Sequence, residues 1–409
     1  MSDATATRPE DQSEPDGLAE VFSAGWSLYE IAGSDDPHAR WRALRERHPV
    51  LDAGDGVFFV SSWSLVDEVL RDSRHGAGIG VSASFDARDG LAPEVMGAWL
   101  MSLDGTEQRR ARGLVRRAFT PRAITELVPT LREVTDTLVA HIEADAGEAP
   151  VDLVEDLAFA LPSEVIRRLF GIPENEWAEE IVSVIRAVDG SPGSSVGMIE
   201  GLAGFFDRRL REDRVPPGLL AELQTPDPAL GRLSQLEVVA NAVLLVTAAI
   251  DTTAGLIGNA IHCLLERPTL LDAIQRSPDR IPDLVEETLR FEPPALSCSR
   301  QAGLDFELGG VRVPAGAHLL LGLAAANRDP SRYPDPDRFD LDRDFRGLLS
   351  FGGGTHHCLG ATLARIEARL AIERLFVESP LRLEAIEPPS WQRSNPTVRA
   401  LERLPVRRV

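Results

Sequence analysis

Residues 351–360 read Phe-Gly-Gly-Gly-Thr-His-His-Cys-Leu-Gly, and this is the most informative stretch of the chain. Its glycines allow the backbone to approach a flat ligand closely. An amphipathic pattern over Leu359–Phe376 predicts a helix, so Cys358 lies where that helix begins. Unpaired N–H groups at a helix N-terminus favour a thiolate over a thiol. The stretch therefore indicates an anionic, electron-rich ligand for a metal.

The residues alone leave other interpretations open. A lone cysteine near a helix start is usually a small buried residue, and this is the first interpretation without further information. His356-His357-Cys358 could belong to a zinc site, but adjacent residues do not easily share one tetrahedral ion, and the sequence offers no second ligand pair. The glycines also lack the Gly-Lys-Ser/Thr ending of a phosphate-binding loop.

The stretch resembles the heme-binding signature of the cytochromes P-450, the heme-thiolate monooxygenases. The pattern Phe-Gly-x-Gly-x-His-x-Cys-x-Gly is matched at Phe351, Gly352, Gly354, His356, Cys358 and Gly360. This resemblance implies heme b (iron protoporphyrin IX), with Cys358 as the axial ligand of the iron. It also implies that His356 hydrogen-bonds a heme propionate and that Gly360 leaves room for the porphyrin.

The resemblance implies a fold as well. We expect a mainly α-helical, triangular body with small β-sheets, in which heme lies between a long central helix and the helix after Cys358. We expect a disordered tail over residues 1–20 and a single cytochrome P-450 domain over residues 21–409.

Glu287-Thr-Leu-Arg290 matches the Glu-x-x-Arg motif of this family, and Pro336-Asp-Arg-Phe339 resembles its downstream Pro-x-Arg-Phe. At spacing i,i+3 the Glu287 and Arg290 side chains share a helix face. Taken alone, the pair reads as a solvated ion pair that contributes little. The resemblance instead implies that Arg338 joins the pair in a buried network supporting the heme loop.

Ala248-Ala-Ile-Asp-Thr-Thr253 interrupts an otherwise apolar helix with polar side chains, which are costly to bury. Thr252 can hydrogen-bond the carbonyl of Ala248, four residues back. A satisfied polar kink is one interpretation. The resemblance makes Asp251 and Thr252 the pair that delivers protons to dioxygen, with Ala248 against the heme. Ala249 stands where the family usually has glycine, which narrows the dioxygen groove.

Asp104-Gly-Thr-Glu-Gln-Arg-Arg-Ala-Arg112 resembles the family segment that carries His-x-x-x-Arg toward a propionate. Gln108 occupies the histidine position, and it can donate a hydrogen bond but carries no charge. The resemblance therefore assigns propionate anchoring mainly to Arg112, Arg300 and His356. Each arginine taken singly could equally be a solvated surface residue.

Basic side chains recur around this segment, at Arg109, Arg110, Arg112, Arg116, Arg117 and Arg122. A helix face balanced by neighbouring acids is one interpretation. The resemblance implies a docking patch for a small acidic ferredoxin, since complementary charge raises the encounter rate.

Composition narrows the class of protein and its location. The 409 residues are 43% hydrophobic and 26% charged, as in globular proteins. A net charge of −21 argues against a nucleic-acid-binding protein. Three cysteines suit a reducing compartment. The N-terminus lacks the apolar core of a signal peptide, and the apolar run Val238–Ile250 is too short to span a membrane. We expect a cytoplasmic protein with no membrane or nucleic-acid partner.

The remaining pattern predicts mostly helices. Helical segments are expected over Glu107–Leu210, with breaks at Pro121, Pro150, Pro162, Pro173 and Gly190–Gly193. A long helix starts at the capping box Ser234–Glu237 and ends before Pro268, and Ile281–Phe291 is another helix. Short strands are predicted over Gly56–Val60, Ala302–Leu323 and Val398–Val406, and loops over Gly76–Asp89 and Asn327–Arg346.

By resemblance the substrate pocket is lined by residues 78–100 and by Leu244, Thr247, Ala248, Leu296, Ser297, Thr397 and Val398. A mostly apolar lining with few hydroxyls suits a hydrophobic or moderately polar organic molecule. We expect a monooxygenase that hydroxylates or epoxidises such a molecule with O2 and two electrons from a ferredoxin and a ferredoxin reductase. By analogy, the reaction belongs to secondary-metabolite or antibiotic biosynthesis.

Three alternatives remain at this point. The scaffold could perform atypical chemistry, such as C–C or C–O coupling or peroxide-driven oxidation, although Asp251 and Thr252 argue against the peroxide route. It could be a heme- or ligand-binding sensor without turnover. A cysteine hydrolase is the weakest alternative, because the sequence singles out no His–Asn/Asp partner set for Cys358.

Overall fold

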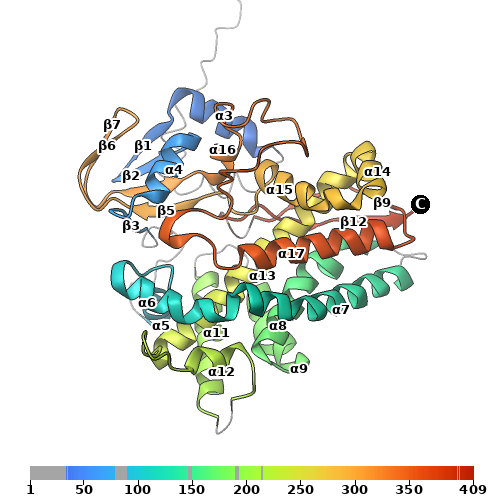
Figure 1. Cartoon of the computed structure of the whole chain (residues 1–409), viewed down its shortest axis with the longest axis horizontal. Coiled ribbons are helices and arrows are strands. Elements are labelled where there is room, and N and C mark those ends of the chain that lie inside the picture. The colour runs from blue at the N-terminus through green and yellow to red at the C-terminus, as the bar shows by residue number, and fades with distance from the viewer. Residues whose placement is uncertain are drawn as a thin grey trace, which may run out of the picture.

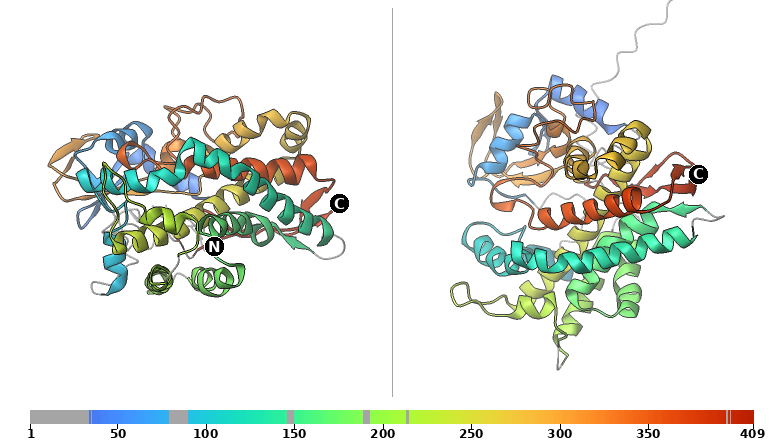
Figure 2. Two further views of the ribbon diagram at one scale, coloured as in Figure 1. Left: turned by 60° about the horizontal axis from the view of Figure 1, so that its bottom comes forward. Right: turned by 45° about the vertical axis from the view of Figure 1, so that its right-hand side comes forward.

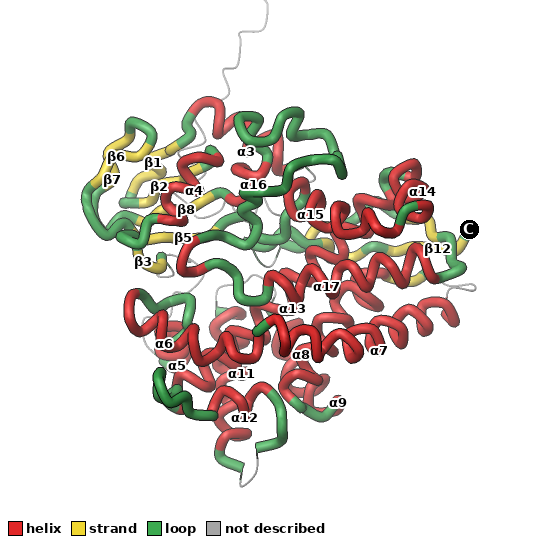
Figure 3. Tube along the Cα trace, in the orientation of Figure 1, coloured by secondary structure: helices red, strands yellow, loops and turns green. Residues whose placement is uncertain are grey.

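The computed structural model describes residues 34, 36–78, 90–145, 150–188, 193–212, 215–393, 395 and 397–409. The tail expected over residues 1–20 and most of the loop expected over Gly76–Asp89 lie outside these residues. Helices form most of the described body, and strands gather mainly at one corner of it (Figures 1 and 3). A small sheet with the C-terminus lies at the opposite end of the helical body (Figure 2). The mainly α-helical fold with small sheets predicted from the sequence is confirmed.

The α-helices are α3 (Pro37–Arg47), α4 (Trp63–Arg71), α5 (Leu91–Gly97), α6 (Gly105–Val115), α7 (Pro121–Asp145), α8 (Ala160–Phe170), α9 (Glu174–Glu176), α10 (Ser183–Arg186), α11 (Ser194–Leu210), α12 (Leu219–Gln224), α13 (Gln235–Leu265), α14 (Pro268–Arg276), α15 (Ile281–Phe291), α16 (Leu323–Asn327) and α17 (Ala361–Ile372). Tight 3-10 turns are η2 (Arg116–Phe119), η5 (Pro278–Arg280) and η6 (Gly354–His356), and wide π-type turns are η3 (Val154–Phe159), η4 (Trp177–Val182) and η7 (Glu373–Glu378).

The strands are β1 (Val50–Gly54), β2 (Val57–Val60), β3 (Gly76–Ala77), β4 (Val151–Asp152), β5 (Cys298–Gln301), β6 (Phe306–Leu308), β7 (Val311–Val313), β8 (His318–Leu321), β9 (Leu383–Ala385), β10 (Ser390–Trp391), β11 (Leu401–Arg403) and β12 (Pro405–Arg408). The largest sheet has the order β1-β2-β8-β5-β3, with β2 and β8 parallel and its other neighbours antiparallel. This sheet joins an N-terminal hairpin to strands from residues 298–321.

Helix α13 is the long helix predicted from the capping box. Ser234 accepts a hydrogen bond from the Glu237 N–H, and the Glu237 carboxylate accepts one from the Ser234 N–H. Its 31 residues span about 45 Å, enough to cross the helical body. By length and composition alone this helix could cross a membrane, but most of its apolar stretch is buried inside the protein. It is therefore a core helix.

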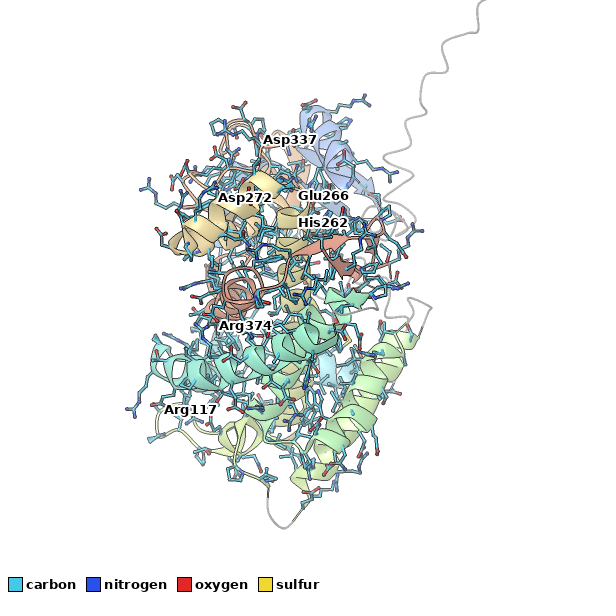
Figure 4. All side chains as sticks on the ribbon, turned by 90° about the vertical axis from the view of Figure 1, so that its right-hand side faces the viewer. Arg117, His262, Glu266, Asp272, Asp337 and Arg374 are labelled. Carbon is cyan, nitrogen blue, oxygen red and sulfur yellow. The ribbon has the colours of Figure 1, made fainter. Side chains whose placement is uncertain are left out.

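Two apolar clusters meet α13 along its length. The C-terminal half of the helix packs with α8, α15 and α17, and the N-terminal half packs with α5, α11 and α12. Arg374, which is labelled in Figure 4, lies in the turn after α17. Its ion pair with Glu143, 2.8 Å long, ties this turn to α7. The packing fixes α17, and with it the loop that precedes this helix, relative to α13.

The prolines break the helices largely where the sequence predicts. Pro121 is the first residue of α7, and Pro173 is the N-cap of α9. The break predicted at Pro162 is wrong, because Pro162 lies inside α8. Wide turns in η3 precede it, so the chain enters α8 without a loop. Most of the Gly190–Gly193 turn lies outside the described residues.

Candidate active site

The loop before α17 is shaped by glycines with positive φ, Gly352 and Gly354, and is closed by a backbone hydrogen bond. Gly354 has φ +66°, and a Cβ there would lie 2.2 Å from the Leu70 carbonyl oxygen at the end of α4, so only glycine fits. The Cys358 N–H donates to the Phe351 carbonyl at 2.9 Å. At Gly360, by contrast, a Cβ would meet no atom within 4 Å. The space at Gly360 fits the room for a porphyrin that the sequence predicts there.

Cys358 is accessible, and its sulfur accepts backbone hydrogen bonds from Gly360 and Ala361 at the start of α17. Protein nonetheless surrounds the sulfur closely enough for burial to raise the pKa of the thiol, against the lowering by these N–H groups and by Arg112 and Arg365. The helix start thus favours the thiolate, as expected, but does not by itself create one. A coordinated metal ion deprotonates such a thiol.

Helix α6 holds the cysteine loop from one side. The Gln108 side chain donates to the Thr355 carbonyl at 2.9 Å, and Arg112 donates to the His357 carbonyl at 2.5 Å. Gln108 is buried, and its side-chain amide supports the loop backbone through this hydrogen bond. His356 lies 3.3 Å from an Asp104 oxygen just before α6. The Asp104 to Arg112 segment therefore lies against the cysteine loop, the position from which the predicted propionate contacts could be made.

Arg300 is a buried cation and Arg112 is a half-buried one, and the guanidinium groups of both contact backbone oxygens. Arg300, on β5, is 7% exposed and donates to the Ser299 carbonyl at 2.8 Å, with Gly353 at 3.5 Å. Among the described residues, neither arginine forms an ion pair with a carboxylate. A cation that is withdrawn from water without a counter-ion is costly. Both positions would therefore suit the carboxylates of heme propionates, if Cys358 ligates the iron.

The buried network below the loop differs from the prediction at one residue. Arg290 and Glu287 are fully buried and pair at 2.7 Å, as expected. The prediction that the Arg338 side chain joins them is wrong: it is 68% exposed and pairs with Asp340, and only its backbone carbonyl accepts from Arg290. The third guanidinium is that of Arg343, 8% exposed and 3.3 Å from Glu287. Arg338 and Arg343 both lie in the long loop between α16 and η6. The path of this loop decides which of the two side chains reaches Glu287.

The polar residues of α13 lie on an accessible part of this buried helix. Thr252 donates to the Ala248 carbonyl at 2.7 Å, the predicted hydrogen bond. Ala248 is exposed and Asp251 partly so, although most neighbouring residues are buried. Helix α13 also packs against α17, the helix that begins just after Cys358. The polar part of α13 therefore lies on a helix that contacts the helix of the cysteine loop.

The Asp251 carboxyl is a titratable group close to neutrality. Burial raises its pKa to about 6, and a side-chain hydrogen bond from Asn395 opposes that rise. A carboxyl with such a pKa can both give and take a proton near neutral pH. Sequence reasoning did not single out Asn395, since an isolated asparagine in the C-terminal segment carries no motif.

The segments expected to line the substrate pocket meet in part. The Leu296 N–H donates to the Thr397 carbonyl at 3.0 Å, and Ala295 pairs with Val398 as an isolated bridge. The Thr247 hydroxyl donates a hydrogen bond to the Val243 carbonyl at 3.0 Å. Leu244 is buried in the core. The Ser297 hydroxyl is buried and has no hydrogen-bond partner within the described part of the chain. Residues 79–89 of the expected lining lie outside the described residues.

Comparison with known proteins places the chain in a family. The family model for Cytochrome P-450 matches residues 206–378. The chain is 37% identical over 380 residues to the vitamin D(3) 25-hydroxylase of Pseudonocardia autotrophica, covering 91% of this chain and 93% of that protein. It is 32% identical over 401 residues to the 6-deoxyerythronolide B hydroxylase of Saccharopolyspora erythraea, covering 91% and 97%.

Among solved structures, a mutant of P-450 EryK in complex with erythromycin B superposes with a TM-score of 0.79 at 31% identity, covering 92% of this chain and 97% of that one. The chain belongs to the cytochrome P-450 family. It is an oxidoreductase of the monooxygenase class, with a heme-thiolate iron as its cofactor. Enzymes of this class act on small molecules with O2 and electrons from redox partners.

Proposed function

We propose that this enzyme hydroxylates or epoxidises a hydrophobic organic molecule in secondary-metabolite biosynthesis, in the cytoplasm, with heme b as its cofactor. The observation that carries the proposal is the donor set: an accessible Cys358 sulfur that accepts hydrogen bonds from backbone N–H groups, with the Arg112 and Arg300 guanidinium groups on backbone carbonyls of the same loop. When bound, the heme supplies the reductive activation of dioxygen.

The chain's own residues would hold the cofactor at two kinds of contact. The Cys358 thiolate would ligate the iron, and the Gly360 and Ala361 N–H groups would stabilise its negative charge. Arg112 and Arg300 would bind the propionates, with His356 beside them. Gln108 would act mainly by holding the backbone at Thr355.

Two residues of α13 would manage protons. Asp251, with a pKa of about 6, would exchange protons with solvent at neutral pH. The Thr252 hydroxyl, fixed on the Ala248 carbonyl, would accept and donate hydrogen bonds at the accessible surface of the helix. This arrangement supports an oxygen-dependent route over a peroxide-driven one, since a peroxide already carries the protons that such a pair delivers.

The substrate would be a bulky, mostly apolar molecule with at least one polar group. Two relatives are named for hydroxylating vitamin D3 and 6-deoxyerythronolide B, both large lipophilic molecules. Leu244, Leu296 and Val398 would supply apolar contacts. The Ser297 hydroxyl would orient a polar group of the substrate, because an unpartnered buried hydroxyl gains from a ligand that bonds it.

The electron donor would be a ferredoxin with its reductase. Of the basic side chains near α6, Arg110 pairs with Glu107 and Glu237, and Arg122 pairs with Glu126. Arg109 and Arg116 are exposed and, within the described residues, pair with no carboxylate. Together with Arg112 they form a patch of net positive charge on an acidic protein, on the side of the cysteine loop.

The proposal is tested by turnover of the purified holoenzyme with a ferredoxin, its reductase and NADPH. Vitamin D3, 6-deoxyerythronolide B and a panel of steroids and macrolactones would be offered, and products with one added oxygen atom would be sought by mass spectrometry under 18O2. Incorporation of 18O into at least one lipophilic compound is expected. Product formed only with peroxide, or no oxygen-containing product from any lipophilic compound, would contradict it.

A further inference from the structure

Asn395 lies between the acid of α13 and the turn expected to contact substrate. Its side chain donates a hydrogen bond to the Asp251 carboxyl. Its amide oxygen accepts two bonds, from the Thr397 N–H at 3.1 Å and the Thr397 hydroxyl at 2.8 Å. Because an amide oxygen accepts and only its NH2 group donates, the Thr397 contacts fix which end of the amide faces Asp251.

Backbone hydrogen bonds also connect Asn395 to the residues that are expected to contact the substrate. The Val398 N–H donates to the Asn395 carbonyl at 3.2 Å, and the Thr397 carbonyl accepts from the Leu296 N–H at 3.0 Å. A continuous chain of hydrogen bonds therefore runs from Leu296 through Thr397 and Asn395 to Asp251. A ligand that shifts the Thr397 turn would shift the donor on the acid.

The partner of Asp251 is neutral. Among the described residues, burial and the Asn395 amide are the two influences on this carboxyl, and no arginine pairs with it. An arginine would hold the carboxyl permanently ionised, whereas an amide orients it and leaves both protonation states accessible.

We infer that Asn395 is a positioning residue that orients the Asp251 carboxyl for proton transfer and links that orientation to the substrate-facing turn at Thr397. The inference rests on the proposed role of Asp251 in proton delivery. It assigns Asn395 no contact with heme or with the reacting atoms.

The link to Asp251 is measured directly in the holoenzyme, without turnover. The protonated Asp251 carboxyl is titrated by infrared difference spectroscopy, with Asp251→Asn identifying its band. Asn395→Asp keeps an oxygen for Thr397 and replaces the donor by a second carboxyl, and it should raise the pKa of Asp251 by about one or more. Asn395→Ala should raise it less, and the exposed Arg393→Ala in the same segment should leave it unchanged.

The link to the turn is measured by hydrogen exchange at the Thr397 and Val398 amides. In the wild type their exchange should change with pH in step with the Asp251 titration, and Asp251→Asn should abolish that dependence. The carbon-monoxide spectrum and thermal unfolding of each variant show whether the fold is intact.

An unchanged Asp251 pKa in Asn395→Asp, or turn exchange indifferent to Asp251, would overturn the inference. These outcomes are independent of the proposed proton role, which fails instead if Asp251→Asn turns over with unchanged efficiency.

Discussion

The cysteine loop and the polar part of α13 have opposite electrostatic surroundings. The cysteine loop is surrounded by cations and backbone N–H groups, from Arg112, Arg300, Arg365 and the start of α17. On α13, one acid lies among apolar residues and is bonded to a neutral amide. The surroundings of the cysteine loop stabilise a permanent negative charge, whereas the surroundings of Asp251 leave its carboxyl free to titrate. With the proposed roles, this difference separates cofactor binding from proton handling within one fold.

The largest effect is expected where the loop-supporting network is broken. Arg290→Ala leaves the Glu287 carboxylate buried with a weaker partner, and should destabilise the fold by about 3–5 kcal/mol. Arg338→Ala, in contrast, removes an exposed ion pair and should change stability by less than about 1 kcal/mol. Urea unfolding of both variants measures the difference. Equal losses in the two would contradict the reassignment of the third guanidinium to Arg343.

The acid of α13 should make stability depend on pH. Its pKa is about 6 in the folded protein and 3.8 in the unfolded chain, so the folded state holds the proton longer. The cost of ionising it appears as pH rises from about 4 to about 6, persists above that range, and amounts to about 3 kcal/mol. Asp251→Asn should therefore stabilise the protein at pH 8 and scarcely at pH 4. A gain that is the same at both values would show that Asp251 is not titrating there.

Thr252→Ala should uncouple electron use from product formation. Loss of the hydroxyl removes a positioned proton donor, and product formed per electron should fall on the order of 100-fold, while NADPH consumption continues. Peroxide and product are measured together with a compound from the turnover panel. Thr135→Ala, whose hydroxyl makes the same kind of bond on α7, serves as the control. Unchanged product per electron would remove Thr252 from the proton pathway.

Anchoring by the enclosed cations should govern how long the heme stays bound. Arg112→Ala and Arg300→Ala each remove a charge-assisted contact, worth about 1.5–3 kcal/mol, and heme transfer to excess apomyoglobin should accelerate about tenfold or more. Arg122→Ala, an exposed arginine paired with Glu126, should have no effect. Transfer rates like that of the wild type in both variants would argue against propionate binding by these residues.

The smallest effect is expected on the exposed patch. Arg109→Glu with Arg116→Glu should slow reduction by an acidic ferredoxin several-fold at low salt, and less at high salt, because the attraction is screened. Stopped-flow reduction measures the rate. Charge reversal at the already paired Arg122 is the comparison. A reduction rate that changes neither with the charge reversal nor with the salt concentration would show that the ferredoxin docks on another surface.

Local patterns in the sequence predicted the structure correctly where the interacting residues are also close together in the chain. The capping box at Ser234, the helix Ile281–Phe291 and the Thr252 to Ala248 bond are all set within one or two helical turns. The break predicted at Pro162 was wrong because Pro162 lies in the first turn of α8, where a missing N–H is tolerated, and η3 leads into that turn without a loop.

Contacts made across loops could not be read from the sequence in the same way. Whether Arg338 or Arg343 reaches Glu287 depends on the path of an irregular segment, and both have the same side chain. Asn395 meets Asp251 across more than a hundred residues, through a turn whose bonds only the folded chain reveals. The docking of such segments is decided by tertiary packing, which no periodicity encodes.

The carbon-monoxide difference spectrum of the reduced, purified protein tests the central claim most directly. Ligation of the heme iron by the Cys358 thiolate predicts the long-wavelength absorption typical of sulfur ligation, and Cys358→His should replace it with the spectrum of an imidazole-ligated heme. A wild-type protein that binds no heme, or that already shows the imidazole-type spectrum, would contradict the account.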